Sequence, residues 1–226
     1  MVRLILAFAF AALTVLSVLS LDAHLAGVRA GDLADCNKGS GDTAIGGCSR
    51  LIESITRLNE SKRRLFGGEL ISEGNLAKAY YNRGIAYEKK GEYDRAIADY
   101  DTAIKLNPKN ATAYNNRGIA YSKKGEYDRA IADYDTAIKL NPNYAMTYSN
   151  RGVAYDGKGQ YDRAIADYDM AIKLNPKYAR AYNNRGNAYE KKGDRDKAIA
   201  DYRKVLELRL GDEMATSGLK RLGVTP

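Results

Sequence analysis

The chain has 226 residues and a formal net charge of +8, from 36 Lys and Arg against 28 Asp and Glu. Its single histidine, His24, argues against imidazole metal clusters and against the Ser–His or Cys–His pairs on which many enzymes depend. Basic and acidic residues are interleaved, whereas a nucleic-acid-binding surface gathers Lys and Arg on one element. We therefore expect no catalytic residues, no cofactor, no metal and no nucleic-acid partner.

The N-terminus begins with a short basic segment and continues with an apolar run over residues 4–21. This order is typical of a secretory signal, which we place at residues 1–30 with cleavage after Ala30; a second candidate site follows Ala23. Cleavage would leave a periplasmic or secreted protein without a stable membrane span. The alternative is an uncleaved signal that anchors the chain in the inner membrane, since the run is at the lower limit for crossing about 30 Å of hydrocarbon.

Two cysteines, Cys36 and Cys48, follow this signal within an atypical segment, residues 31–76. In an exported protein an even pair of cysteines predicts a disulfide. Residues 42–52 align with residues 94–104, which predicts the second helix of a degenerate leading half-repeat. Cys48 takes the place of a large aromatic residue in that alignment, and the disulfide would tie the helix to a preceding loop.

From residue 77 the sequence repeats with a period of 34 residues, at 77–110, 111–144, 145–178 and 179–212. Residues 82–109 and 116–143 are identical at 26 of 28 positions. A fixed period of this length indicates one supersecondary unit stacked into an array, in which each copy buries its apolar face against its neighbours. Residues 213–226 would then form a polar capping helix.

The sequence of each repeat predicts two helices joined by a tight turn. In the second repeat, Tyr114, Gly118 and Tyr121 share one face of the first helix, and the glycine lets the partner helix approach closely. Gly125 supplies the left-handed residue that ends this helix. Pro142 ends the second helix, because proline removes a hydrogen-bond donor and restricts the residue before it.

This pattern resembles the tetratricopeptide repeat (TPR), whose signature is met in the second repeat by Tyr114, Gly118, Tyr121, Ala130, Tyr134, Ala137 and Pro142. The resemblance implies an all-α fold, a right-handed TPR solenoid of helical hairpins with a degenerate leading half-repeat and a C-terminal capping helix. The fourth repeat departs from the signature at Arg195, Val205 and Leu210.

Members of that family bind a peptide or protein segment on the concave face of the first helices. The resemblance places the following residues on that face: Tyr81, Asn82, Ile85, Asn115, Asn116, Ile119, Ser149, Asn150, Val153, Arg180, Asn183, Asn184 and Asn187. The asparagines can donate to and accept from a partner's backbone, and the aliphatic members form an apolar stripe. The alternative is that the asparagines bond to the adjacent turn and the aliphatic residues pack beneath the next helix.

An arginine recurs where the family usually has an apolar residue, and an aspartate recurs on the following helix. The pairs are Arg83 with Asp99, Arg117 with Asp133, Arg151 with Asp167, and Arg185 with Asp201. One interpretation is a ladder of partly exposed ion pairs, each worth at most about 1 kcal/mol. The other is an anion-binding array.

The sequence thus predicts a non-catalytic scaffold or adaptor of the cell envelope that binds a protein or peptide partner. A structural repeat protein that assembles with further copies of itself is the first alternative. The second is a non-catalytic subunit of an envelope enzyme complex.

Overall fold

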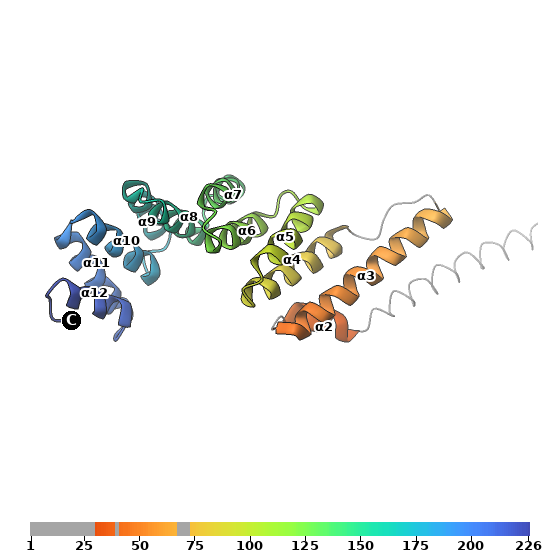
Figure 1. Cartoon of the computed structure of the whole chain (residues 1–226), viewed down its shortest axis with the longest axis horizontal. Coiled ribbons are helices and arrows are strands. Elements are labelled where there is room, and N and C mark those ends of the chain that lie inside the picture. The colour runs from red at the N-terminus through yellow and green to blue at the C-terminus, as the bar shows by residue number, and fades with distance from the viewer. Residues whose placement is uncertain (1–29, 39–40, 67–72) are drawn as a thin grey trace, which may run out of the picture. The chain divides into compact units, whose positions relative to one another are not determined.

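The structure, a computed structural model, describes residues 30–38, 41–66 and 73–226 (Figure 1). Eleven helices and no strands occur among these residues, which confirms the predicted all-α fold. The predicted signal lies outside the described residues except for Ala30, the first residue of α2. The helices form two compact units, residues 1–91 and 92–226, so the boundary falls inside the first predicted repeat.

The described helices of the first unit are α2 (Ala30–Lys38), α3 (Gly41–Phe66) and α4 (Glu73–Lys89). Cys36 on α2 and Cys48 on α3 form the predicted disulfide, with 4.5 Å between their Cα atoms. Cys36 therefore lies on a helix rather than in the loop that the sequence suggested. The two helices approach so closely that a Cβ atom on Gly47 would lie 2.6 Å from the Cβ of Asp35. The leading element is a hairpin of the nine-residue helix α2 and the longer helix α3, and its assignment as a degenerate half-repeat stays a prediction.

Contacts between α3 and α4 reproduce those between later repeats. Lys90 binds Asp42 at the start of α3 over 2.6 Å, as Lys124 binds Asp94 at the start of α5. Arg83 donates to the Ser49 hydroxyl over 3.1 Å. Residues 42–52 and 94–104 align in sequence, and the aspartate at the start of each segment also binds the equivalent lysine.

The second unit contains α5 (Tyr93–Leu106), α6 (Ala111–Lys123), α7 (Tyr127–Leu140), α8 (Ala145–Gly157), α9 (Tyr161–Leu174), α10 (Ala179–Lys192), α11 (Arg195–Leu208) and α12 (Glu213–Arg221). The pairs α6–α7, α8–α9 and α10–α11 are hairpins, and each first helix also contacts the second helix before it. We call α6, α8 and α10 the first helices, and α5, α7, α9 and α11 the second helices.

A glycine and a tyrosine set the distance within each of these hairpins. Tyr168 of α9 is buried, and its ring lies against Gly152 of α8. A Cβ atom at Gly152 would lie 2.6 Å from the ring, and one at Gly118 would lie 2.7 Å from the ring of Tyr134. The glycine costs about 1 kcal/mol of helix propensity relative to alanine, and burial of a tyrosine ring offsets that cost.

The predicted arginine–aspartate ladder is present throughout the second unit. Arg151 donates from Nε and Nη2 to the two carboxylate oxygens of Asp167, over 2.8 and 2.7 Å. Its Nη1 donates to Asp135 on the preceding hairpin over 2.5 Å, and Arg117 and Arg185 bond in the same way. Arg83 and Asp99 belong to different units, and their pairing stays a prediction.

The ladder is more buried than the sequence suggested, since the side chains of Asp167 and Arg151 are only 7% and 20% exposed. The hydrogen bonds from Arg151 to Asp167 hold the arginine pKa above its usual value. Because each of its three guanidinium nitrogens donates to a carboxylate, Arg151 has a structural role. This supports the ion-pair interpretation over the anion-binding array.

The last repeat is followed by α12 rather than by another repeat, and it departs from the repeat signature at three positions. Arg195 donates to the carbonyl of Leu222 over 2.6 Å, where a tyrosine stands in the earlier repeats. Val205 is fully buried in a cluster with Leu219 of α12. Leu210, which replaces the proline, lies beyond the end of α11 and is exposed.

Substitution of Arg151 by alanine will lower the free energy of unfolding by about 3 kcal/mol, because it leaves the buried Asp167 carboxylate without its partner. Urea unfolding followed by circular dichroism measures the change. Lys158→Ala is the control: it removes an ion pair with the exposed Asp128 and will cost at most about 1 kcal/mol. Equal losses for the two variants would show that the ladder contributes no more than a surface ion pair.

Reduction of the Cys36–Cys48 disulfide will destabilise the α2–α3 hairpin by about 3 kcal/mol, the chain-entropy value for a closed loop of this length. Hydrogen exchange of α3 amides, compared in the oxidised protein and in a Cys36→Ser/Cys48→Ser variant, measures the effect. The amides of α9 provide an internal reference. Unchanged α3 protection would mean that Leu51, Ile52 and Ile55 hold the hairpin without the disulfide.

Candidate functional site

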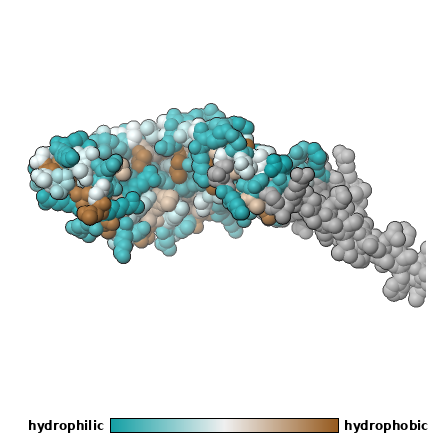
Figure 2. Space-filling model, turned by 90° about the horizontal axis from the view of Figure 1, so that it is seen from below, coloured by the Kyte–Doolittle hydropathy of each residue, from teal (hydrophilic) through white to brown (hydrophobic). Residues whose placement is uncertain are grey.

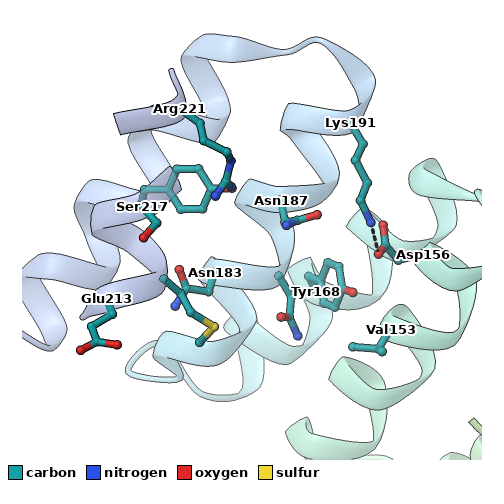
Figure 3. A pocket seen from close by; sticks show the side chains of 12 residues that line it. Val153, Asp156, Tyr168, Asn183, Asn187, Lys191, Glu213, Ser217 and Arg221 are labelled. Carbon is teal, nitrogen blue, oxygen red and sulfur yellow. Dashed lines mark hydrogen bonds and ion pairs between the residues drawn. The ribbon is translucent and has the colours of Figure 1, made fainter. Parts of the chain in front are cut away.

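Two adjoining hollows lie on the side of the second unit that the first helices form. The central hollow has a volume of about 280 Å³ and is lined by Ile119, Ser122, Lys123, Tyr127, Tyr134, Asn150, Val153, Asp156, Gly157 and Arg180. The C-terminal hollow has a volume of about 510 Å³ and is lined by Val153, Asp156, Tyr168, Asn183, Asn184, Asn187, Lys191, Tyr202, Glu213, Met214, Ser217 and Arg221 (Figure 3). Because Val153 and Asp156 line both, one extended ligand could occupy the two hollows together.

Tyrosines of the second helices line both hollows. Tyr134 lines the central hollow, whereas Tyr168 and Tyr202 line the C-terminal one. Burial raises the pKa of the Tyr168 hydroxyl, so this group stays protonated at neutral pH. The lining of each hollow therefore includes a tyrosine that is packed in the core of a hairpin.

The C-terminal hollow contains polar atoms that are buried and have no hydrogen-bond partner among the described residues. They are Oδ1 of Asn183, Nδ2 of Asn184 and Oδ1 of Asp156. Leaving such a group unsatisfied costs about 1–3 kcal/mol. Because these three atoms have almost no solvent-accessible surface, hydrogen bonds to a ligand are left to the exposed polar side chains of the lining, such as Asn187 and Ser217.

The charged groups of the two hollows differ. In the C-terminal hollow, Lys191 binds Asp156 over 2.5 Å (Figure 3), and Arg221 makes two 2.9 Å hydrogen bonds to Glu190. Those bonds from Arg221 hold the pKa of Glu190 below its ordinary value. In the central hollow, Lys123 and Arg180 form no ion pair with any described residue.

Several asparagines predicted to face a partner also bond to other polar side chains of the protein. Asn115 is only 1% exposed. Its Oδ1 accepts from Asn150 over 3.0 Å, and its Nδ2 donates to Asn116 over 3.1 Å. Ser149 and Asn183 are also buried, and Asn183 donates to Asp212 over 3.2 Å. Most of the surface of each of these side chains is therefore buried against neighbouring helices.

Five of the predicted polar residues line the hollows. Asn150 and Arg180 lie in the central hollow, and Asn183, Asn184 and Asn187 lie in the C-terminal one. Ile119 and Val153 are half-buried against the hairpin cores and also line a hollow, so both interpretations of the aliphatic stripe apply to them. The predicted residues of the first unit are half-buried, and Asn82 donates to Asn37 of α2.

Sequence reasoning missed the second-helix tyrosines and the residues of α12 as parts of this surface. Met214, Ser217 and Arg221 of α12 form one wall of the C-terminal hollow. In the view of Figure 2, apolar surface occurs in separate patches between hydrophilic side chains rather than as one apolar face. Of the described helices, none is both long and apolar enough to cross a membrane. The described residues also contain no cluster of three or more metal-binding side chains.

Comparison with known families and structures gives a consistent result. Models of the tetratricopeptide repeat match residues 81–145, 133–166 and 179–209, and a TPR repeat model matches residues 157–193. The search of curated proteins returned no match.

Two crystal structures of MamA resemble the chain. One has a TM-score of 0.59 and 30% identity over 72% of this chain and 89% of that chain. The other has a TM-score of 0.58 and 27% identity over 80% of this chain and 89% of that chain. The first TPR of Spaghetti (RPAP3), bound to HSP90 peptide SRMEEVD, has 32% identity and a TM-score of 0.49 over 50% of this chain and 90% of that chain.

Asp212 holds the α12 wall, since its carboxylate accepts from the backbone N–H groups of Met214 and Ala215 and from Asn183. Asp212→Ala will destabilise α12 by about 1 kcal/mol, the usual cost of losing an N-cap. The amides of residues 213–221 will then exchange about fivefold faster with solvent. Glu213→Ala leaves the cap intact and is the matched control. Equal exchange in both variants would contradict the role of Asp212.

Proposed function

Because the chain belongs to the tetratricopeptide repeat family, we propose that it is a non-catalytic scaffold that binds an extended segment of another protein along the two hollows. The observation that carries this proposal is the continuity of the hollows through Val153 and Asp156. A peptide rises about 3.3 Å per residue when extended, so its backbone can follow several first helices. The exposed side chains of Asn187 and Ser217 would then bond to that backbone.

The proposed binding mode uses side chains differently from the sequence prediction. Asn187 is exposed and is available to a partner, whereas Asn115 and Asn150 hold α6 and α8 together. The buried asparagines therefore act as structural supports, and the exposed polar residues make the contacts. The half-buried Val153 and Tyr127 supply apolar surface that a bound segment would cover.

The proposed location is the cell envelope, after export through the N-terminal signal at residues 1–30. The apolar run of residues 4–21 supports this location, as does the disulfide, because disulfides persist in oxidising compartments. The uncleaved anchor stays as the alternative. The signal lies almost entirely outside the described residues.

Photo-crosslinking tests the binding face directly. A benzoylphenylalanine placed at Asn187 or Ser217 will crosslink to a partner in an envelope extract, because both side chains are exposed in the C-terminal hollow. The same group at Ala166, which is exposed on α9 outside both hollows, will not crosslink. Equal products from all three positions would contradict the proposal.

The mass of the crosslinked product separates the scaffold from the self-assembling alternative. A product of about twice the chain mass of 24.9 kDa, obtained with purified protein alone, would favour the self-assembling repeat protein. Products that need the extract favour a separate partner, including an envelope enzyme to which this chain is a non-catalytic subunit. Asn187→Tyr, which fills the hollow, will reduce the extract-dependent products, whereas Ala166→Tyr will leave them unchanged.

A further inference from the structure

From the central hollow we infer the chemistry of the bound segment: it presents a carboxylate side chain beside an aliphatic one to the space between α6, α8 and α10. This inference rests on the proposed function and adds a ligand class and a specificity-determining residue to it. The residue is Gly157. Three features carry the argument: a break in the repeat pattern, two cations without ion pairs, and an adjoining apolar wall.

The break in the pattern is at the end of α8. The equivalent position is a lysine in the other repeats, Lys89, Lys123 and Lys191, but it is Gly157 in the third. The ring of Tyr127 fills the space beside this glycine, since a Cβ atom at Gly157 would lie 2.5 Å from Cζ of Tyr127. No side chain can stand at this position without moving the tyrosine.

The next repeat shows what a lysine does at this position. The ammonium of Lys191 lies 5.6 Å from the centre of the Tyr161 ring and binds Asp156 of the preceding first helix. A lysine in place of Gly157 would in the same way extend across the Tyr127 ring. Gly157 therefore keeps the central hollow open, with Tyr127 in its lining.

The charges of the central hollow favour an anionic ligand. Lys123 projects from α6 and Arg180 from α10, so the two cations stand on either side of α8. Among the described residues neither forms an ion pair, whereas the one carboxylate in the lining, Asp156, is already bound to Lys191. An arginine guanidinium matches a carboxylate with two parallel hydrogen bonds. Both cations in the C-terminal hollow, by contrast, already have carboxylate partners.

The apolar part of the hollow favours an aliphatic neighbour for that carboxylate. Ile119 and Val153 line the hollow one repeat apart, and both are only half-buried. Covering them gains roughly 25 cal/mol for each Å² removed from water. Since successive side chains of an extended segment point to opposite sides, the carboxylate and the aliphatic group that enter the same hollow would be two residues apart.

Selection from a phage-displayed library of random twelve-residue peptides tests the inference with the whole chain as bait. The selected peptides will be enriched in Asp or Glu two residues from Leu, Ile or Val. In fluorescence anisotropy, a synthetic copy of the best peptide will bind Arg180→Glu at least about tenfold more weakly than the unchanged protein, because one charge-assisted contact becomes a repulsion. Arg163→Glu makes the same charge change on α9 outside the hollow and will leave binding unchanged.

A second variant tests the role of Gly157 independently of charge reversal. Gly157→Met places an uncharged side chain of about the length of lysine in the hollow and will weaken the same peptide by about tenfold through loss of the open space. Ala166→Met makes a similar uncharged change on α9 and is its control. If Gly157→Met fails to fold, as judged by circular dichroism, Arg180→Glu alone decides the result.

The outcomes separate this inference from the proposed function. Peptides that lack acidic residues, or that bind Arg180→Glu as tightly as the unchanged protein, overturn the inference. If such peptides still lose affinity in Asn187→Tyr, the groove proposal stands without it. A library that yields no peptide sensitive to Asn187→Tyr overturns both.

Discussion

The constraint on which the second unit depends is the pairing of a buried aspartate with an arginine that also reaches the previous hairpin. Asp167 is buried against α8, so its charge needs a partner, and Arg151 supplies one with two hydrogen bonds. The remaining Nη1 bond to Asp135 links that hairpin to the one before it. Repetition of this geometry at Arg117 and Arg185 sets the spacing of successive first helices and hence the shape of the surface they form.

The same spacing places the tyrosines and asparagines that surround the hollows. Each glycine in a first helix accepts a tyrosine ring from the second helix, which brings the ring to the floor of a hollow. Asn150 then bonds to Asn115 across neighbouring first helices. A partner would therefore meet a surface whose polar groups are already held in place, so less conformational entropy is lost on binding.

Much of the fold could be predicted from the sequence because the hairpin contacts repeat with the 34-residue period. The Gly118–Tyr134 contact and the Arg–Asp pairs of the second unit recur at fixed positions, and the structure confirms them. Helix α2 was harder to predict, since it has only nine residues and stands outside the period. Its disulfide was inferred from the cysteines, but only the structure shows that Cys36 lies on a helix.

The candidate site was less predictable, because one helix position can serve packing or binding. Asn115 and Asn187 lie on first helices, yet the former is buried and the latter exposed. The difference depends on the neighbouring side chains in three dimensions, which the repeat pattern does not specify. The sequence shows that Gly157 replaces the lysine found at the equivalent position of the other three repeats. Its effect on the central hollow depends on the ring of Tyr127, which only the structure places beside it.

The central claim is that a bound protein segment covers the hollows formed by the first helices and α12. Two methionines provide native probes, since Met214 is 63% exposed in the C-terminal hollow and Met170 is 36% exposed on α9. Their oxidation by hydrogen peroxide can be followed by mass spectrometry with and without a saturating partner or selected peptide. The account predicts that the bound segment slows oxidation of Met214 and leaves Met170 unchanged. Protection of Met170 with no protection of Met214 would contradict it.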